Sequence, residues 1–309
     1  MVRAMALSKD GRTLLTAGKD LTVTVWDLQG RAAPRPLSSL RLRHRQQEVS
    51  ALAISGDGRL LLTNSAAPPQ QYFTTSELWD ISDRSRPRLL GSLESPWSGA
   101  FAVALSPDTH RALIGEGVAG VALWDITDRH APRRLAWVTG KTQPLDHKGV
   151  VDLAAFGPDA RTALTAAADG SAYLWGLDAK GEAHRITSLA RLAGTPSSAR
   201  ISPDGHLLIT ADAVGTATVW DISVPSDPQS LAVLEYGRTP VTTVAFGTDG
   251  TTALTGGPGL PTRLWDITRL TRIAADPVRA VCAVLPSALS RTEWSRFTKD
   301  VPYEDGCAG

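Results

Sequence analysis

A tryptophan, usually followed by aspartate, returns along this chain at intervals of about 45 to 53 residues. Its six occurrences are Trp26-Asp27, Trp79-Asp80, Trp124-Asp125, Trp175-Gly176, Trp220-Asp221 and Trp265-Asp266. Upstream of each tryptophan comes a turn tetrapeptide of the form SKDG, SGDG, SPDT, GPDA, SPDG or GTDG. Internal periods of this length are typical of propellers and solenoids. The chain is therefore predicted to fold as six similar units.

Each unit has the pattern of four short antiparallel strands. One strand precedes the tetrapeptide, a second follows it, a third ends at the tryptophan, and a fourth follows a polar loop. That loop often contains proline, as in 81–90 and 126–135, which is tolerated beside an edge strand. Four strands cannot bury both faces of their sheet alone, and radial stacking leaves only short edges exposed. The predicted fold is an all-β, six-bladed β-propeller.

The stretch GEGVAGVALWD, residues 115–125, contains the spacing GxGxxG of dinucleotide-binding proteins. That motif needs a helix after the glycines, because the helix N-terminus holds the pyrophosphate. Here the residues that follow alternate and are β-branched or aromatic, so they predict a strand. The glycines are interpreted as a hairpin turn.

These units resemble the WD-repeat β-propeller family over residues 1–275. Their proline-bearing loops also resemble bacterial, actinomycete-type WD repeats, which often follow signalling NTPase or kinase modules. The resemblance implies a structural tetrad of His, Ser or Thr, Asp and Trp in a blade. The fourth unit has the complete tetrad: His147, Thr165, Asp169 and Trp175. In four other units the Asp position holds Phe73, Val118, Val214 and Gly259.

The composition excludes several classes of protein. A net charge of +1 provides no field to attract nucleic acid or an anionic membrane, and the basic stretch 31–45 is interpreted as a solvated outer strand. No apolar run of about 18 residues is present to span a membrane, and the N-terminus is too quickly polar for a signal peptide. Two cysteines cannot form a disulfide framework, so a cytoplasmic protein is expected.

Residues 276–309 are predicted to form a separate helical tail. Asp276-Pro277 has the pattern of a helix start, and Ser290 with Glu293 has capping-box spacing. The two cysteines, Cys282 and Cys307, bracket this tail, and as a hypothesis their sulfurs are close enough to pair. The ending also resembles that of bacterial WD repeats, in Cys282, Glu293-Trp294, Pro302-Tyr303 and Cys307.

The ring is expected to close without a shared strand. Residues 2–7 lead directly into the first turn, so they already form the first strand of unit one. Unit six would then own a fourth strand at residues 270–274, and side chains of the first and last blades would pack together, helped by the tail. The abrupt start also suggests the trailing part of a longer ancestral protein.

The leading functional hypothesis is a non-enzymatic scaffold or sensor that binds a protein partner on the top face of the propeller. Aromatic residues and arginine dominate interface hot spots. The top-face loops offer Tyr72, Phe73, Trp97, Tyr236 and Arg238. The alternative for each is packing into its own blade. A partner of unknown identity is expected, or an NTPase or kinase encoded upstream or separately.

The alternative function is a six-bladed hydrolase or lactonase with a metal in its tunnel. Such a site needs several inward carboxylates on the first strands, where only Asp152 was found in the sequence. His147 and Asp169 have no nucleophile placed beside them, so they are not interpreted as part of a catalytic triad. No catalytic residue, cofactor or metal is therefore assigned.

Overall fold

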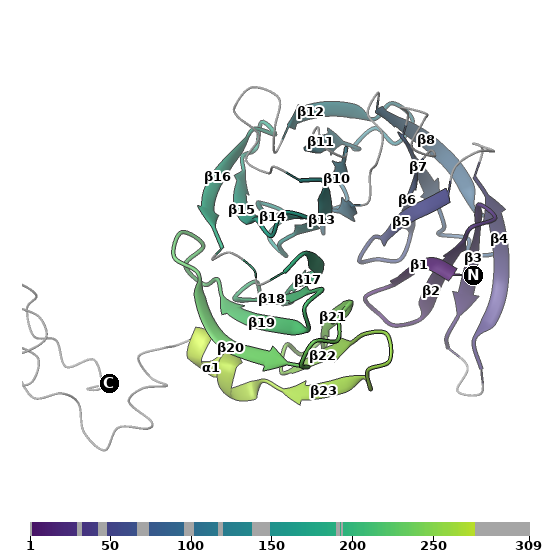
Figure 1. Ribbon diagram of the computed structural model, residues 1–309. Coiled ribbons are helices and arrows are strands. Elements are labelled where there is room, and N and C mark those ends of the chain that lie inside the picture. The colour runs from purple at the N-terminus through teal and green to yellow at the C-terminus, as the bar shows by residue number, and fades with distance from the viewer. Residues whose placement is uncertain are drawn as a thin grey trace, which may run out of the picture.

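The computed structural model describes residues 2–29, 33–42, 48–66, 74–95, 102–116, 120–137, 149–189, 192 and 194–275. Within them, the strands form six antiparallel sheets, which stand around a common axis as the blades of a propeller (Figure 1). The predicted six-bladed β-propeller is confirmed. In each blade the strands are named a, b, c and d from the axis outward, in chain order.

Blades one to three follow each other from the N-terminus. Blade one consists of β1 (Val2–Leu7), β2 (Thr13–Gly18), β3 (Thr22–Asp27) and β4 (Arg35–Arg41). Blade two consists of β5 (Glu48–Ile54), β6 (Leu60–Ala66), β7 (Thr74–Asp80) and β8 (Arg88–Ser95). Blade three consists of β9 (Val103–Leu105), β10 (Arg111–Gly115), β11 (Val121–Asp125) and β12 (Arg133–Trp137).

Blades four and five also have four strands, and the sheet of blade six has three. Blade four consists of β13 (Val151–Phe156), β14 (Thr162–Ala167), β15 (Ala172–Leu177) and β16 (Ala183–Ser188). Blade five consists of β17 (Pro196–Ile201), β18 (Leu207–Asp212), β19 (Thr216–Asp221) and β20 (Gln229–Glu235). Blade six consists of β21 (Thr243–Phe246), β22 (Thr252–Gly256) and β23 (Arg263–Asp266).

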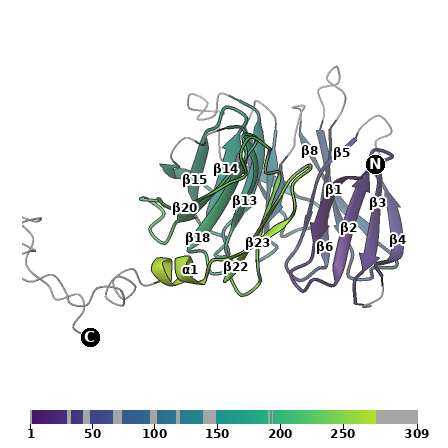
Figure 2. The same cartoon turned by 60° about the horizontal axis from the view of Figure 1, so that its bottom comes forward.

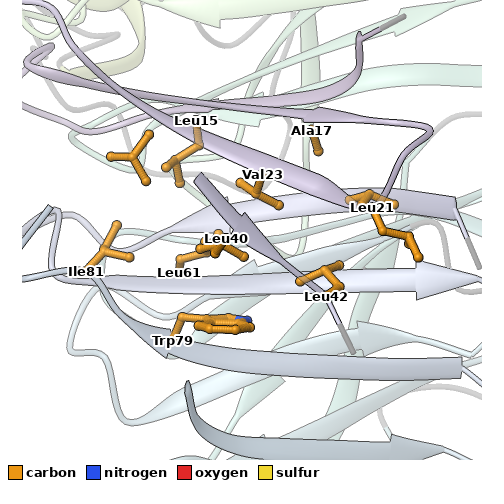
Figure 3. Packing of buried hydrophobic residues seen from close by; sticks show 11 residues of the cluster. Leu15, Ala17, Leu21, Val23, Leu40, Leu42, Leu61, Trp79 and Ile81 are labelled. Atoms are coloured by element: carbon orange, nitrogen blue, oxygen red, sulfur yellow. The ribbon is translucent and has the colours of Figure 1, made fainter. Parts of the chain in front are cut away.

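The core lies between neighbouring blades. Alternate residues of each strand point to opposite faces of its sheet. In a blade with a packed neighbour on each side, both faces of the sheet are therefore covered. Between blades one and two, Leu15 and Val23 pack against Leu61 and Trp79 (Figure 3). Equivalent clusters join blades two to three, three to four, four to five and five to six. In each, the tryptophan of strand c packs against the preceding blade.

The turns between strands a and b explain the repeated tetrapeptides. In blade one, the Ser8 hydroxyl donates to the Asp10 carboxylate at 2.5 Å and accepts from the Thr13 amide at 2.9 Å. Blade four has Gly157 in place of the serine, and there the Thr162 hydroxyl donates to the Asp159 carboxylate at 3.0 Å. In blade six the Thr251 hydroxyl donates to the Asp249 carboxylate at 2.7 Å. A local hydrogen bond therefore holds these turns whether or not serine is present.

The prediction that residues 270–274 form a fourth strand in blade six is wrong. Helix α1 (Thr268–Ala275) occupies this part of the chain. The Asp266 carboxylate accepts from the Thr268 amide at 2.9 Å, which starts the helix, and Leu270 packs on the cluster between blades five and six. Apolar Leu270, Ile273 and Ala274 also follow helical spacing. Figure 2 shows the N-terminus and α1 at opposite ends of the propeller.

The predicted packing between blades one and six is also wrong for the described residues. Met5 lies on the face of β1 turned away from blade two and is 67% exposed. Leu264 lies on the face of β23 turned away from blade five and is 71% exposed. Trp26 of blade one is half-buried, whereas the tryptophans of blades two to five are buried. No buried cluster joins these two faces within the described ranges, and we call this boundary the seam.

Blades one and six should consequently open before the rest of the ring. In hydrogen exchange, amides of β2 and β22 should exchange at least about tenfold faster than those of β10 and β14, since each lacks packing on one face. The measurement is native-state exchange followed by mass spectrometry. Uniform protection around the ring would contradict this expectation.

Candidate protein-interaction site

The connections from strand d to the next strand a lie at the same end of the propeller as the turns between strands b and c. We call this the d–a end, and the opposite end, which carries the turns between strands a and b, the a–b end. Of the five predicted contact residues, Tyr236 and Arg238 lie in the connection between β20 and β21. Tyr72, Phe73 and Trp97 lie outside the described residues.

The connection from Tyr236 to Pro240 is bonded to the b–c turn of blade five. The Tyr236 amide donates to the Gly215 carbonyl at 2.9 Å, and the Val241 amide donates to the Asp212 carbonyl at 3.2 Å. Gly215 has a φ of +97°, a conformation that glycine adopts without steric cost. These two bonds fix the connection, which we call the 236–240 loop, to the b–c turn of blade five at the d–a end.

Tyr236 anchors the 236–240 loop to blade six. Its ring stands edge-on to Trp265, with the ring centroids 6.2 Å apart and the planes at 80°. The guanidinium of Arg263 lies 4.7 Å from the centre of the Tyr236 ring, within the range of a cation–π interaction. The Tyr236 hydroxyl also forms a hydrogen bond with Thr255 Oγ1. The contacts of this half-buried ring are thus made largely within the protein.

Arg238 lies two residues beyond this anchor, and its side chain is exposed. Within the described part of the chain it forms no ion pair. Val214, at the tip of the b–c turn, is 46% exposed. Its backbone amide donates to the Asp212 carboxylate at 3.2 Å. The structure therefore brings a cation and an apolar side chain to the surface on two loops that are bonded to each other.

Sequence analysis missed Val214 and Arg263 as parts of this site. Val214 had a visible signal, because a β-branched apolar residue stands at the turn position where the tetrad pattern expects aspartate. Arg263 had no such signal. Its role depends on stacking against a ring from the preceding connection, which is not a local property of the sequence.

Of the residues predicted as a structural tetrad in blade four, Thr165 and Trp175 are buried on neighbouring strands, and Asp169 is half-buried in the b–c turn. Trp175 Nε1 donates to Thr165 Oγ1 at 2.8 Å, and the Asp169 carboxylate accepts from the Ser171 amide at 3.0 Å. His147 lies outside the described residues. Blades one, five and six have the same Trp-to-Thr bond: Trp26 to Thr16, Trp220 to Thr210 and Trp265 to Thr255. These bonds satisfy indole N–H groups that are buried or half-buried, which is a structural role.

A partly buried ion pair lies at the d–a end of blade three. Arg134 Nη2 is 2.7 Å from Glu116 Oε1, and the Glu116 side chain is fully buried. The Arg134 guanidinium also lies 5.2 Å from the centre of the Trp124 ring. Sequence analysis did not identify this pair. It ties strands b and d of one blade together, which indicates that it stabilises the blade.

Asp152, the carboxylate considered for a tunnel metal, lies on the inner strand β13. Burial raises the pKa of its carboxyl group, since the charged form loses contact with water. A metal site needs several such ligands converging on one point. Across the described ranges, no three His, Cys, Asp or Glu side chains are grouped so that they could hold a metal ion.

Comparisons with known proteins identify the repeat. A family model described as "WD domain, G-beta repeat" matches residues 1–27 and 141–176, which belong to the first and fourth units. A NAD(+) hydrolase named ApTIR from an Actinoplanes species is 62% identical over 40 residues, 13% of this chain and 6% of that protein. Protein groucho of Drosophila melanogaster is 28% identical over 109 residues, 35% of this chain and 14% of that protein.

The matched part of the chain spans only a small fraction of either relative. In its described part, the chain has no helix with the length and apolar character to cross a bilayer. The family-model match coincides with units that the structure resolves into strands of the same ring. The sequence repeat, the six blades and the family-model match together support a WD-repeat β-propeller.

Proposed function

We propose that this protein is a non-catalytic interaction module that binds a protein partner at the d–a end of its propeller. The observation that carries the proposal is the 236–240 loop, in which Tyr236 is fixed to blade six while Arg238 remains exposed. A loop that is already ordered loses little conformational freedom on binding. The anchored Tyr236 ring therefore keeps the loop ordered, so that Arg238 can contact a partner at little entropic cost.

The chemistry of this surface fits a protein partner. Arginine is among the residues most enriched in interface hot spots, since its guanidinium can pair with carboxylates and backbone carbonyls. Val214, exposed on the turn that is bonded to the same loop, supplies apolar area that a partner can cover. Tyr72, Phe73 and Trp97 remain proposed contact residues of the same end. In this assignment Tyr236 acts as an anchor and Arg238 as the contact.

The propeller is proposed to serve an effector. Both relatives are much longer than the segments they share with this chain, and one is named as a NAD(+) hydrolase. A repeat module within such proteins would recognise a partner or a signal for the remainder. We extend this arrangement to the present protein as a cytoplasmic scaffold whose effector, an NTPase or a kinase, is encoded upstream or separately.

Replacing Arg238 by alanine should weaken partner binding at least about thirtyfold, the loss expected of a hot-spot residue worth 2 kcal/mol. The measurement is affinity capture from the source cell followed by titration of the captured protein. Arg59→Ala is the matched control, because Arg59 is an exposed arginine at the a–b end. Equal loss in both variants, or no loss in Arg238→Ala, would refute this surface.

A further inference from the structure

A cavity of about 570 Å³ lies on the axis at the a–b end. Residues from the a–b region of all six blades surround it. Much of the wall is apolar and comes from the last residues of the inner strands: Leu7, Leu105, Phe156, Ile201 and Phe246. Prolines 107, 158 and 203 of the following turns complete this wall. The cavity is thus within the usual size of a small-molecule site, roughly 300–1,000 Å³.

One charged residue breaks the symmetry of this wall. In every blade, the residue of strand a that stands two positions before the a–b turn pairs with an apolar residue of strand b. These six positions are therefore equivalent. Blade five has Arg200 at this position, opposite Ile209. The other five blades have alanine there: Ala6, Ala53, Ala104, Ala155 and Ala245. The protein therefore places a long cationic side chain where the ring elsewhere has a methyl group.

The Arg200 side chain lines the cavity, is exposed to solvent there and has unused hydrogen-bonding capacity. Its Nη1 donates to the Ala199 carbonyl at 2.7 Å, which uses one of five N–H donors. No carboxylate in the described part forms an ion pair with it. An arginine stays charged in proteins, so this side chain brings one positive charge to the cavity wall.

The other charges around the cavity do not neutralise Arg200. Lys9 and Asp10 lie in the blade-one turn at its edge. The Asp10 carboxylate accepts from the Ser8 hydroxyl and from the Arg12 amide, so its oxygens are already used in the turn. The lining thus has one more positive than negative charge. A ligand with one negative charge would complete it.

We propose that this cavity binds a small organic carboxylate with a compact apolar body. The carboxylate would accept two parallel hydrogen bonds from Arg200, a geometry that suits guanidinium, and the apolar body would lie against the leucine, isoleucine and phenylalanine walls. A single arginine matches a monoanion better than a doubly charged phosphate. This site lies at the end opposite the 236–240 loop, so it does not depend on the proposed function.

The test is isothermal titration with 4-phenylbutyrate, its neutral amide 4-phenylbutanamide, and inorganic phosphate. The carboxylate should bind at least tenfold more tightly than either of the other two. Arg200→Ala, which installs the residue of the other five blades, should reduce binding of the carboxylate to the level of the amide. Arg200→Met retains the apolar stem and should give the same loss, while Arg86→Ala, an exposed arginine on blade two, should not.

Unchanged circular dichroism and melting temperature in these variants would show that the loss of binding is local. Equal affinity for the acid and the amide would overturn the proposed charge recognition. Equal affinity for phosphate and the acid would overturn the apolar half of the site. Binding that survives in Arg200→Ala and Arg200→Met would overturn the assignment altogether.

Discussion

Trp220→Ala should lower the free energy of unfolding by about 3–5 kcal/mol, the usual cost of deleting a buried aromatic side chain. Trp220 is only 5% exposed and packs between blades four and five. Trp26→Ala should cost much less, about half as much or below, because the same indole position in blade one faces the seam and is half-buried. Urea unfolding followed by circular dichroism measures both.

This pair is informative because the hydrogen bond is the same in both blades. Trp220 donates to Thr210 at 2.9 Å, and Trp26 donates to Thr16 at 2.8 Å. Any difference between the two alanine variants therefore reports packing against the preceding blade and not the polar bond. Equal losses would mean that the face of blade one is covered in solution.

Gly215→Ala should strongly destabilise the d–a end. A Cβ atom there would lie 2.5 Å from the Gly237 carbonyl oxygen and 2.8 Å from the Thr239 carbonyl oxygen. Backbone carbonyls cannot move aside like a side chain, so the 236–240 loop would have to leave its turn. We expect a loss of about 3 kcal/mol from strain and clash together, and weaker partner binding as Arg238 is displaced.

Gly237→Ala is the matched control for this prediction. Gly237 also has a positive φ, +72°, but a Cβ atom there would meet nothing within 4 Å. Gly237→Ala should lower the free energy of unfolding only by the cost of alanine in a left-handed backbone conformation, about 1–2 kcal/mol. Thermal unfolding of both variants measures the difference. A Gly215→Ala protein as stable as Gly237→Ala would show that the loop does not pack on its turn.

The blades could be predicted because their determinants are local. A serine or threonine near an aspartate holds each a–b turn, and a tryptophan marks the end of each strand c. The end of blade six could not be predicted by extending this pattern. Thr268 to Ala275 follow a Trp-Asp as strand d should, but the Asp266 cap and the packing of Leu270 favour a helix.

The candidate sites were only partly visible in the sequence. Tyr236 and Arg238 stand together in one loop, and both attract attention as interface residues. Their proposed division into anchor and contact depends on Arg263, Trp265 and Thr255, which come from the next blade. Arg200 becomes unusual only when six inner strands are aligned on their turns, because its own strand shows ordinary alternation.

We propose that the d–a end meets a protein partner through Arg238. The most direct measurement retains Arg238 and places a photo-crosslinking amino acid at position 214, on the exposed tip of the turn that is bonded to the 236–240 loop. A second protein carries it at position 59 on the a–b end, and both are irradiated in the source cell. We expect a discrete covalent adduct with one protein from position 214, its loss when Arg238→Ala is added, and no adduct from position 59. An adduct from position 59 alone, no adduct from position 214, or an adduct that Arg238→Ala leaves unchanged would contradict this role of Arg238.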